Sequence, residues 1–349
     1  MKILIIKLSA LGDVLVSTPF FRLIKQQHPD WEVHHLVMRH CASVTENNPW
    51  VEKQIVVDFI PSGNQFNDLK VLSLLWLRLL RERYDLAILF HRNFLFQLLC
   101  KFAGISKIIG FNSTKNWFLD HSLTYGTVLN RTIQEHHLLL EGGIQSPVPD
   151  RLEFYPDKRL IDFSKIEQLP ETFVACNPGG GNLHASAINK QWPIRYFAKL
   201  IDQITFPVVV LGYGKIDQQL DKKLSKMTKK KYSSFVGYTN LHETAIILER
   251  SRLYVGNDSS LTYLSAAMGT LTLGLFGPTQ TSSYNPLGSH QYYLKGTAPC
   301  APCYNPFDGI NGSMYTCKNN VCMQNINVPD VIKIINEILD LNIFPKREK

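Results

Sequence analysis

The fold is decided by residues 253–280, which read LYVGNDSSLTYLSAAMGTLTLGLFGPTQ. A short apolar run over residues 253–255 leads into a polar turn, and small residues continue in a helical pattern from 260 to 268. A second apolar run follows at 271–276. Strand, helix and strand in this order indicate a parallel crossover, because parallel neighbours need a connection long enough to hold a helix.

The same alternation of strand and helix patterns repeats along both halves of the chain. In the first half it covers residues 3–7, 18–27, 33–37, 68–83, 86–90, 93–103 and 107–110. In the second half it covers residues 173–177, 194–204, 207–211, 218–227, 234–236, 241–250 and 253–276. This alternation is typical of parallel sheets that carry helices on both faces. We therefore predict an α/β fold of two doubly wound, Rossmann-like domains whose ligand crevices face a central cleft.

A stretch rich in glycine and proline, residues 141–170, separates the two halves. We place the first domain at residues 1–165 and the second at residues 166–328. A further helical pattern in residues 329–349 follows the second sheet. We expect this helix to pack back over the first domain.

Charge restricts the classes of partner. The chain has 37 Lys and Arg against 29 Asp and Glu, which gives a net charge of +8. This excess favours anionic partners such as nucleotides, phosphorylated glycolipids or an acidic membrane surface. The basic residues are not interleaved with aromatic residues in a recognisable nucleic-acid module, so we do not expect nucleic acid as a partner.

Hydropathy and cysteine content predict the compartment. No stretch reaches the eighteen or so consecutive apolar residues of a membrane span, so we expect a soluble or peripheral protein. The seven cysteines are odd in number and lie partly in predicted strands and helices. They fit a reducing compartment better than a disulfide framework, and we predict a cytoplasmic protein.

An acidic residue, Asp13, stands where the first strand pattern passes into a helical one. The segment 2–24 reads KILIIKLSALGDVLVSTPFFRLI. Helix N-termini favour carboxylates and anions, because their free N–H groups carry partial positive charge. Asp13 is therefore either a cap or first-turn acid of the helix, or a carboxylate used in chemistry.

Polar groups also follow the strand pattern at 253–255. The next helical pattern begins with Asp258, Ser259 and Ser260. The amides and hydroxyls of the two serines are placed to bind a diphosphate, and the carboxylate of Asp258 is placed to bind sugar hydroxyls. The alternative is an ordinary helix cap built from Asp and Ser.

A glycine-rich loop follows the first strand pattern of the second domain. Residues 177–193 read NPGGGNLHASAINKQWP and include Ser186 and Lys190. Glycine lets backbone amides approach a phosphate, and lysine supplies a mobile positive charge. Asp217, which follows another strand pattern, is a candidate ligand for a ribose.

Three segments together resemble the bacterial ADP-heptose:lipopolysaccharide heptosyltransferases, glycosyltransferase family 9, which have the GT-B fold. They are residues 1–20, 173–193 and 236–280. The resemblance implies that Asp13 is the general base on the acceptor hydroxyl. It also implies that Lys190 contacts the phosphate or ribose of the donor, with Ser186 as a helper.

The donor block departs from the family pattern at two positions. The resemblance implies donor contacts by Asp258, Ser259, Ser260 and Tyr263, but Ser260 stands where the family has glycine and Tyr263 where it has histidine. Tyr263 keeps a hydrogen-bonding group and lacks the imidazole cation. On the acceptor side we assign Ser9 and Arg92. Arg92 follows a strand pattern, where it is placed to reach an anionic acceptor, and the alternative is that these residues only form a capped helix start.

The resemblance implies an inverting transfer of heptose from ADP-heptose to a lipopolysaccharide or lipooligosaccharide core acceptor, at the cytoplasmic face of the inner membrane, with no cofactor required for catalysis. Two alternatives stay open. The same fold would serve a protein (autotransporter) acceptor or another nucleotide-sugar donor, and a non-catalytic protein would bind the nucleotide-sugar alone.

Four late cysteines form the pattern C-x2-C-x13-C-x4-C. They are Cys300, Cys303, Cys317 and Cys322. Thiolates at such spacing can hold zinc or iron in a tetrahedral structural site. The alternative is a loop with reduced cysteines and no ligand, and the sequence does not choose between them.

Overall fold

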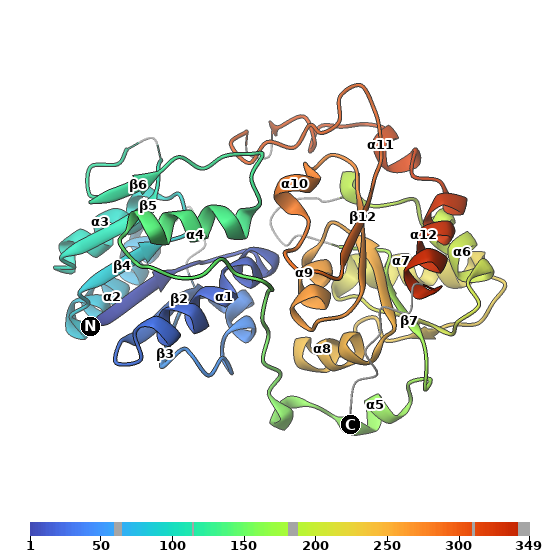
Figure 1. The fold of residues 1–349 in the computed structure, drawn as a ribbon, viewed down its shortest axis with the longest axis horizontal. Helices are drawn as coiled ribbons and strands as arrows, with labels where there is room; N and C mark the ends of the chain where they lie inside the picture. The colour runs from blue at the N-terminus through green and yellow to red at the C-terminus, as the bar shows by residue number, and fades with distance from the viewer. Residues whose placement is uncertain (59–64, 114, 181–187, 309–310, 341–349) are drawn as a thin grey trace. The chain divides into compact units, whose positions relative to one another are not determined.

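The computed structural model describes residues 1–58, 65–113, 115–180, 188–308 and 311–340. It divides the chain into two compact units, Met1–Tyr155 and Pro156–Lys349 (Figure 1). The division falls inside the glycine- and proline-rich stretch 141–170. Each unit contains a six-stranded sheet.

In the first unit the sheet has the order β3-β2-β1-β4-β5-β6, and all neighbouring strands are parallel. The strands are β1 (Lys2–Ile6), β2 (Glu32–Met38), β3 (Lys53–Val57), β4 (Leu86–Leu89), β5 (Lys107–Phe111) and β6 (His121–Leu123). The helices are α1 (Leu11–Gln27), α2 (Gln65–Glu82), α3 (Phe94–Phe102) and α4 (Arg131–Glu141), with a 3-10 helix η1 (Arg39–Val44).

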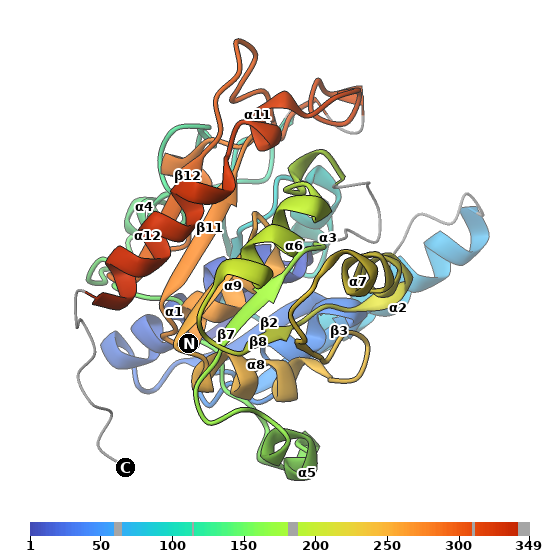
Figure 2. The ribbon, with the colours of Figure 1, turned by 90° about the vertical axis from the view of Figure 1, so that its right-hand side faces the viewer.

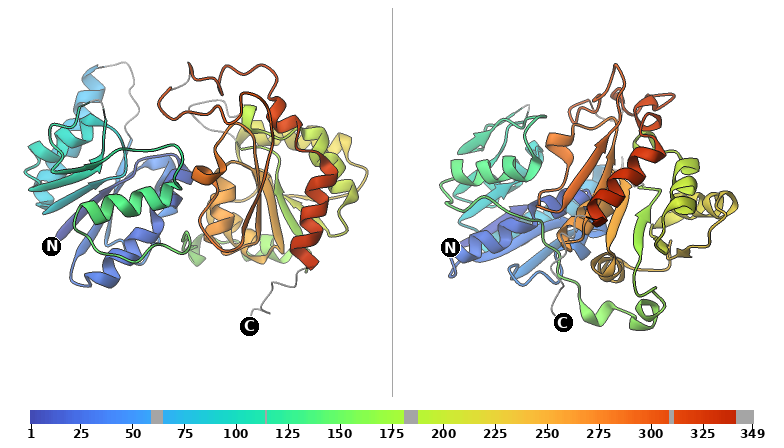
Figure 3. Two further views of the ribbon diagram at one scale, coloured as in Figure 1. Left: turned by 45° about the horizontal axis from the view of Figure 1, so that its top comes forward. Right: turned by 45° about the vertical axis from the view of Figure 1, so that its right-hand side comes forward.

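Strand β1 is central, and its side chains alternate between two cores. Leu4 and Ile6 pack in the core formed with α2 and α3, whereas Ile3 and Ile5 pack in the core formed with α1 and α4. Because both faces are covered, the strand is apolar throughout. Helices α1 and α4 contact each other on one face of the sheet (Figure 3).

In the second unit the sheet has the order β12-β11-β10-β7-β8-β9, again parallel throughout. The strands are β7 (Val174–Asn177), β8 (Val208–Val210), β9 (Ser233–Ser234), β10 (Leu253–Asn257), β11 (Thr272–Phe276) and β12 (Gln291–Lys295). The helices are α5 (Phe163–Glu167), α6 (Ile194–Gln203), α7 (Gly214–Met227), α8 (Leu241–Arg250), α9 (Ser260–Ala267), α10 (Thr281–Tyr284), α11 (Val321–Gln324) and α12 (Val328–Asp340), with 3-10 helices η2 (Lys158–Leu160) and η3 (Ile188–Lys190).

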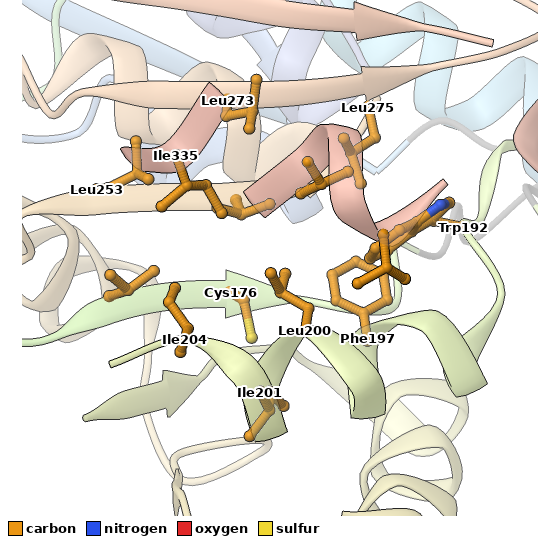
Figure 4. Close-up of a cluster of buried hydrophobic side chains, with 14 of the residues drawn as sticks. Cys176, Trp192, Phe197, Leu200, Ile201, Ile204, Leu253, Leu273, Leu275 and Ile335 are labelled. Atoms are coloured by element: carbon orange, nitrogen blue, oxygen red, sulfur yellow. The ribbon is translucent and has the colours of Figure 1, made fainter. Parts of the chain in front are cut away.

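The last helix, α12, packs in the core of the second unit. It contacts α6, and its buried side chains share one cluster with residues of α6, β10 and β11 (Figures 2 and 4). These side chains are Val328, Val331, Ile335, Ile338 and Leu339. Through these side chains α12 belongs to the second unit, and the expectation that residues 329–349 also pack over the first domain stays a prediction. The apolar stripe of α12 completes the core on this face of the second sheet.

Several elements lie outside the predicted pattern. Helix α1 begins at Leu11, before the helical pattern at 18–27, and Asp13 lies in its first turn, one of the two positions expected for it. Strands β3, β6 and β12 and helix α4 are not predicted at all. The sequence does not indicate helix α4, because this helix buries polar side chains, including Gln134, Glu135 and His136, and therefore lacks a periodic pattern of apolar residues.

Candidate active site

In both parallel sheets, the order in which successive strands are added changes direction at one point. The first sheet reverses between β1 and β4, and the second reverses between β7 and β10. Open parallel sheets bind ligands at the carboxyl ends of the strands beside such a reversal. The loops that follow these four strands therefore contain the candidate site residues of each unit.

Asp13 lies in the loop and first helical turn that follow β1. Its Oδ2 accepts a hydrogen bond from the N–H of Ala10 at 2.9 Å, and its Oδ1 forms an ion pair with the guanidinium of Arg131. Arg131 is the first residue of α4 and also donates to the hydroxyl of Tyr125 at 2.9 Å. Asp13 is thus both a first-turn acid of α1 and one partner of a charged pair, with about a third of its side chain (32%) exposed.

A second, fully buried pair lies beside the first. Lys7 Nζ contacts Glu135 Oε1 at 2.5 Å, and the hydroxyl of Ser17 donates to Glu135 Oε2 at 2.7 Å. Lys7 also donates to the carbonyl of Phe90, at the end of β4, at 3.2 Å. Because Arg131 and Glu135 are one turn apart on α4, a single helix face holds partners for both α1 and β1.

The charges around Asp13 act on its pKa in opposite directions. Burial works to raise the pKa, but the positive charges of Arg131 and Lys7 and the N–H of Ala10 outweigh it and lower the pKa to about 2. The carboxylate is therefore ionised throughout the physiological range. Burial raises the pKa of Glu135, against the opposing effect of Lys7.

His91 follows β4 and faces the same charges. Burial, with a further contribution from Lys7, lowers the pKa of His91 to about 4. The imidazole is therefore neutral at pH 7. Its neighbour Arg92 is exposed and donates from Nε to the carbonyl of Asn112 at 3.0 Å. Ser9, half-buried, lies in the loop between β1 and α1.

In the second unit, Lys190 and Asp258 form an ion pair after β7 and β10. The distance from Lys190 Nζ to Asp258 Oδ2 is 2.8 Å, and both side chains are largely buried. The ammonium also lies over the ring of Tyr304, at 4.8 Å from its centroid, and 5.9 Å from that of Tyr284. The lysine is thus held in place by a carboxylate and two aromatic faces.

Glycines let the loops of this edge approach each other closely. A Cβ placed on Gly180 would lie 2.8 Å from the Cβ of Ser259, and Gly180 has a φ of +109°. Both the contact and the dihedral exclude a side chain at this position. Asn257 connects the same loops, because its Nδ2 donates to Gly179 O at 2.8 Å and its Oδ1 accepts from Trp192 N at 2.8 Å.

Asp217 belongs to this edge, but its carboxylate is buried within the protein. It accepts hydrogen bonds from Tyr213 N at 3.0 Å and Gly180 N at 3.4 Å. A Cβ on Gly179 would lie only 1.9 Å from its Oδ1. Burial raises the pKa of Asp217. Its carboxylate therefore ties two loops together.

The remaining predicted donor residues have different surroundings. Tyr263 is buried, and its hydroxyl donates to the carbonyl of Tyr284 at 2.7 Å. Ser259 is the N-cap residue of α9 and Ser260 begins the helix, and both are half-buried. Ser186 lies outside the described residues.

Several buried oxygens at this edge, including Oγ of Ser259, have no hydrogen-bond partner among the described residues, and two of them lie at the ends of β7 and β11. These two are Oγ1 of Thr279, which follows β11, and Oδ1 of Asn177, at the end of β7. Buried polar groups are normally hydrogen-bonded, so an unsatisfied one marks a place where a ligand or water can bind. Both lie at the carboxyl ends of strands near the reversal of the second sheet.

The four late cysteines do not form a metal site in the described residues. All four are free thiols, with Cys322 buried and Cys300 exposed. Within the described part of the chain, no three or more His, Cys, Asp or Glu residues are arranged to hold a metal ion. The segment instead packs through its backbone, where the N–H groups of Cys303 and Tyr304 donate to Pro278 O at 2.9 and 2.8 Å. Both alternatives for these cysteines, a structural zinc or iron and a loop of reduced thiols, therefore stay open.

Three residues of these sites are absent from the sequence-based assignment. Arg131 and Glu135 lie on α4, and the sequence does not indicate this helix because its buried face is polar. Their spacing of four residues was the one available signal, since such a pair shares a helix face. Tyr304 lies in a loop between cysteines, and no local pattern indicates that it covers Lys190.

Two doubly wound parallel units in tandem are the arrangement of the GT-B fold. In each unit the polar side chains lie at the carboxyl edge of the sheet, where open α/β sheets bind their ligands.

The chain belongs to glycosyltransferase family 9 (heptosyltransferase), whose sequence model matches residues 73–309. It is 25% identical over 316 residues to lipooligosaccharide heptosyltransferase 2 of Haemophilus ducreyi, covering 84% of this chain and 88% of that protein. The predicted family, the predicted GT-B fold and the assignment as a glycosyltransferase are therefore confirmed.

Two solved structures share the fold. A glycosyltransferase family 9 protein from Veillonella parvula superposes with a TM-score of 0.80 at 20% identity, covering 97% of each chain. E. coli ADP-heptose lipopolysaccharide heptosyltransferase II superposes with a TM-score of 0.76 at 18% identity, covering 98% of this chain and 99% of that one. Among the described residues, no helix is both long enough and apolar enough to cross a membrane.

Proposed function

We propose that this protein transfers heptose from ADP-heptose to a lipopolysaccharide or lipooligosaccharide core acceptor, with inversion at the anomeric carbon. The family membership and the similarity to the lipooligosaccharide heptosyltransferase 2 of Haemophilus ducreyi support the sugar and the acceptor class. The observation that carries the proposal is the ionised carboxylate of Asp13 at the reversal of the first sheet.

The donor binds at the carboxyl edge of the second sheet. Lys190 neutralises the diphosphate, and the amides around Gly180 and Ser259 approach it closely because no side chain intervenes. Asp258 holds the lysine until the anion arrives and is then free to accept from a sugar hydroxyl. The orphaned hydroxyl of Thr279 supplies one more donor at this edge.

The carboxylate of Asp13 takes the proton of the acceptor hydroxyl as the new glycosidic bond forms. The bond from the anomeric carbon to the diphosphate breaks on the opposite face, and ADP leaves with the electron pair. A carboxylate with a pKa of about 2 is a weak base. It suffices here because the hydroxyl becomes strongly acidic once its oxygen bonds to an oxocarbenium-like carbon.

On the acceptor side, Arg92 and Ser9 are the residues we assign to the phosphorylated core. The net charge of +8 supports an anionic acceptor. Such an acceptor is anchored in a bilayer, so we place the enzyme at the cytoplasmic face of the inner membrane, in peripheral contact with it. Asp217 and Tyr263 act as structural supports of the donor loops.

The test of the base is the Asp13→Asn variant, which keeps the shape of the side chain and removes its charge. We expect kcat to fall on the order of a hundredfold or more, with donor affinity in calorimetry unchanged. Asp30→Asn, at an exposed acid near the end of α1, serves as the matched control. Near-normal turnover by Asp13→Asn would sink the assignment.

The test of the donor is calorimetric titration with ADP-heptose, UDP-sugars and GDP-sugars. We expect tight binding of ADP-heptose alone, and mass spectrometry and NMR of the product should give one added heptose with inverted anomeric configuration. Preference for a UDP- or GDP-sugar, or transfer to a protein in place of the core glycolipid, would replace the proposed reaction with one of its relatives.

A further inference from the structure

Helix α2 presents an unusual outward face. Its inward side packs in the first core through Leu75 and Leu79, which are buried. On its outward side, four leucines are exposed: Leu69 by 66%, Leu74 by 58%, Leu77 by 37% and Leu80 by 40%. Single exposed apolar residues are ordinary, but a group on one helix marks an interaction site.

The leucines and the cations lie in two adjacent rows along the helix, with three of the four leucines in one row and all three cations in the other. Positions 69, 73, 77 and 80 form one row, and positions 70, 74, 78 and 81 form the next, because helix neighbours are three and four residues apart. These rows contain four leucines, Lys70, Arg78, Arg81 and one serine. From Leu69 onwards the outward rows contain no acidic residue.

The cations of this face are available for an external anion. Lys70, Arg78 and Arg81 are exposed, and none of them forms an ion pair with a described residue. The acid at the end of the helix, Glu82, points away and pairs with Lys2 and Lys53. The positive charge of the outward face is therefore not neutralised by its own helix.

The neighbouring helix extends the same surface. Helix α3 contacts α2 and ends in Lys101 and Phe102, both exposed, with 65% of Phe102 accessible. Both helices precede parallel strands, so their C-terminal ends lie at the same edge of the sheet. A cation and a large apolar side chain thus recur at the end of each helix.

We propose that the outward face of α2, extended by the end of α3, is the surface that binds an anionic phospholipid bilayer. Leucines enter the boundary between headgroups and acyl chains, while the long stems of Lys70, Arg78 and Arg81 bring their charges to the lipid phosphates. A row of leucines beside a row of cations that form no ion pair with described residues, with no acid in either row, fits this partner better than a protein surface. The inference deepens the proposed function, which requires access to a membrane-anchored acceptor.

The experiment is co-sedimentation of the full chain with vesicles of phosphatidylcholine alone or mixed equally with phosphatidylglycerol. We expect binding to the mixed vesicles that weakens as salt increases. Leu74→Gln/Leu77→Gln should lower the partition coefficient by roughly tenfold or more. Arg78→Gln/Arg81→Gln should lower it by about fivefold per charge.

Matched controls come from the second unit. Leu160→Gln/Phe163→Gln removes two side chains of similar exposure, 47% and 48%, and Lys222→Gln/Lys223→Gln removes two exposed charges. Both should bind vesicles as the unaltered protein does. Equal losses in the controls, or no binding of the unaltered protein to the mixed vesicles, would overturn the proposal.

Transferase assays separate this proposal from the proposed reaction. With a lipid-free core oligosaccharide, the α2 variants should turn over normally, and with a vesicle-embedded acceptor they should be slowed. If the unaltered protein transfers heptose to neither acceptor, the reaction fails while vesicle binding still stands. If sedimentation equilibrium shows that the unaltered protein is a dimer and the leucine variant a monomer, the face belongs to a second copy and the membrane proposal fails.

Discussion

At the scale of single residues, the site of the first unit depends on how Asp13 is held. Its carboxylate has an N–H donor on one oxygen and a guanidinium on the other, so its orientation is fixed by two elements. Arg131 also removes basicity from the group that we propose as the base. Arg131 can therefore favour catalysis only if the orientation of the Asp13 carboxylate contributes more to the rate than its basicity does.

Removing the guanidinium tests this balance. A carboxylate with a depressed pKa is ionised at every pH above that value, so the unaltered enzyme should keep its activity down to the pH at which it unfolds. Arg131→Gln removes the main positive charge that lowers the pKa of Asp13, so the pKa should rise toward 4 or above. We expect kcat/KM of the variant to decline between about pH 6 and pH 4.

The pH–rate profile is the measurement that checks this expectation. Arg195→Gln, which removes an exposed arginine of α6, is the control and should leave the acidic limb unchanged. A profile for Arg131→Gln that is parallel to that of the unaltered enzyme would argue against electrostatic control of Asp13 by Arg131.

Residues were predictable from the sequence where a strand ends directly before them. Asp13, Lys190 and Asp258 each follow a buried strand or its glycine loop, so their place at the sheet edge follows from the pattern. The burial of Asp217 and Tyr263 was not predictable from the sequence. Both are buried by partners far away in the chain, Gly180 and Tyr284, and local pattern contains no information on such contacts.

At the scale of elements, helix α4 is attached by a buried ion pair. Lys7 and Glu135 have 4% and 1% of their side chains exposed. Lys7→Met leaves the carboxylate of Glu135 buried without its partner, so we expect a loss of roughly 3–5 kcal/mol in the free energy of unfolding. The double variant Lys7→Met/Glu135→Leu should recover most of this loss.

A double-mutant cycle in urea measures the coupling between the two residues. The exposed pair Lys333–Glu337, 3.9 Å apart, is the matched control. Its cycle should give a coupling below about 1 kcal/mol. A coupling for Lys7 and Glu135 as small as that of the control would mean that the buried pair does not stabilise α4.

Helix α12 offers a second test at this scale. Ile335 is fully buried in the core with α6 and β11 (Figure 4). Ile335→Ala should cost roughly 2–5 kcal/mol and speed hydrogen exchange in residues 194–203 of α6. Lys333→Ala, two residues away and exposed, should change neither quantity. Unchanged exchange in α6 would mean that α12 is not part of this core.

At the scale of the whole molecule, the chain repeats one topology. Both sheets place their first strand in the centre and reverse beside it, with the orders β3-β2-β1-β4-β5-β6 and β9-β8-β7-β10-β11-β12. The alternation of apolar runs predicted two such sheets, because buried parallel strands are continuous and apolar. It did not predict the edge strands β3, β6 and β12, because their half-exposed positions include polar residues that interrupt the apolar runs.

The repeated topology leaves open which unit binds the nucleotide, and hydrogen exchange can decide this. At an ADP concentration about 100 times Kd, the binding unit gains about 2.7 kcal/mol, which slows exchange through its unfolding by about a hundredfold. We expect this protection in β7, β10 and α9. Lys190→Ala should abolish it, and Lys199→Ala, at an exposed lysine of α6, should keep it. Protection in β1 and α1 instead would assign the nucleotide to the first unit and leave Asp13 without its role as base.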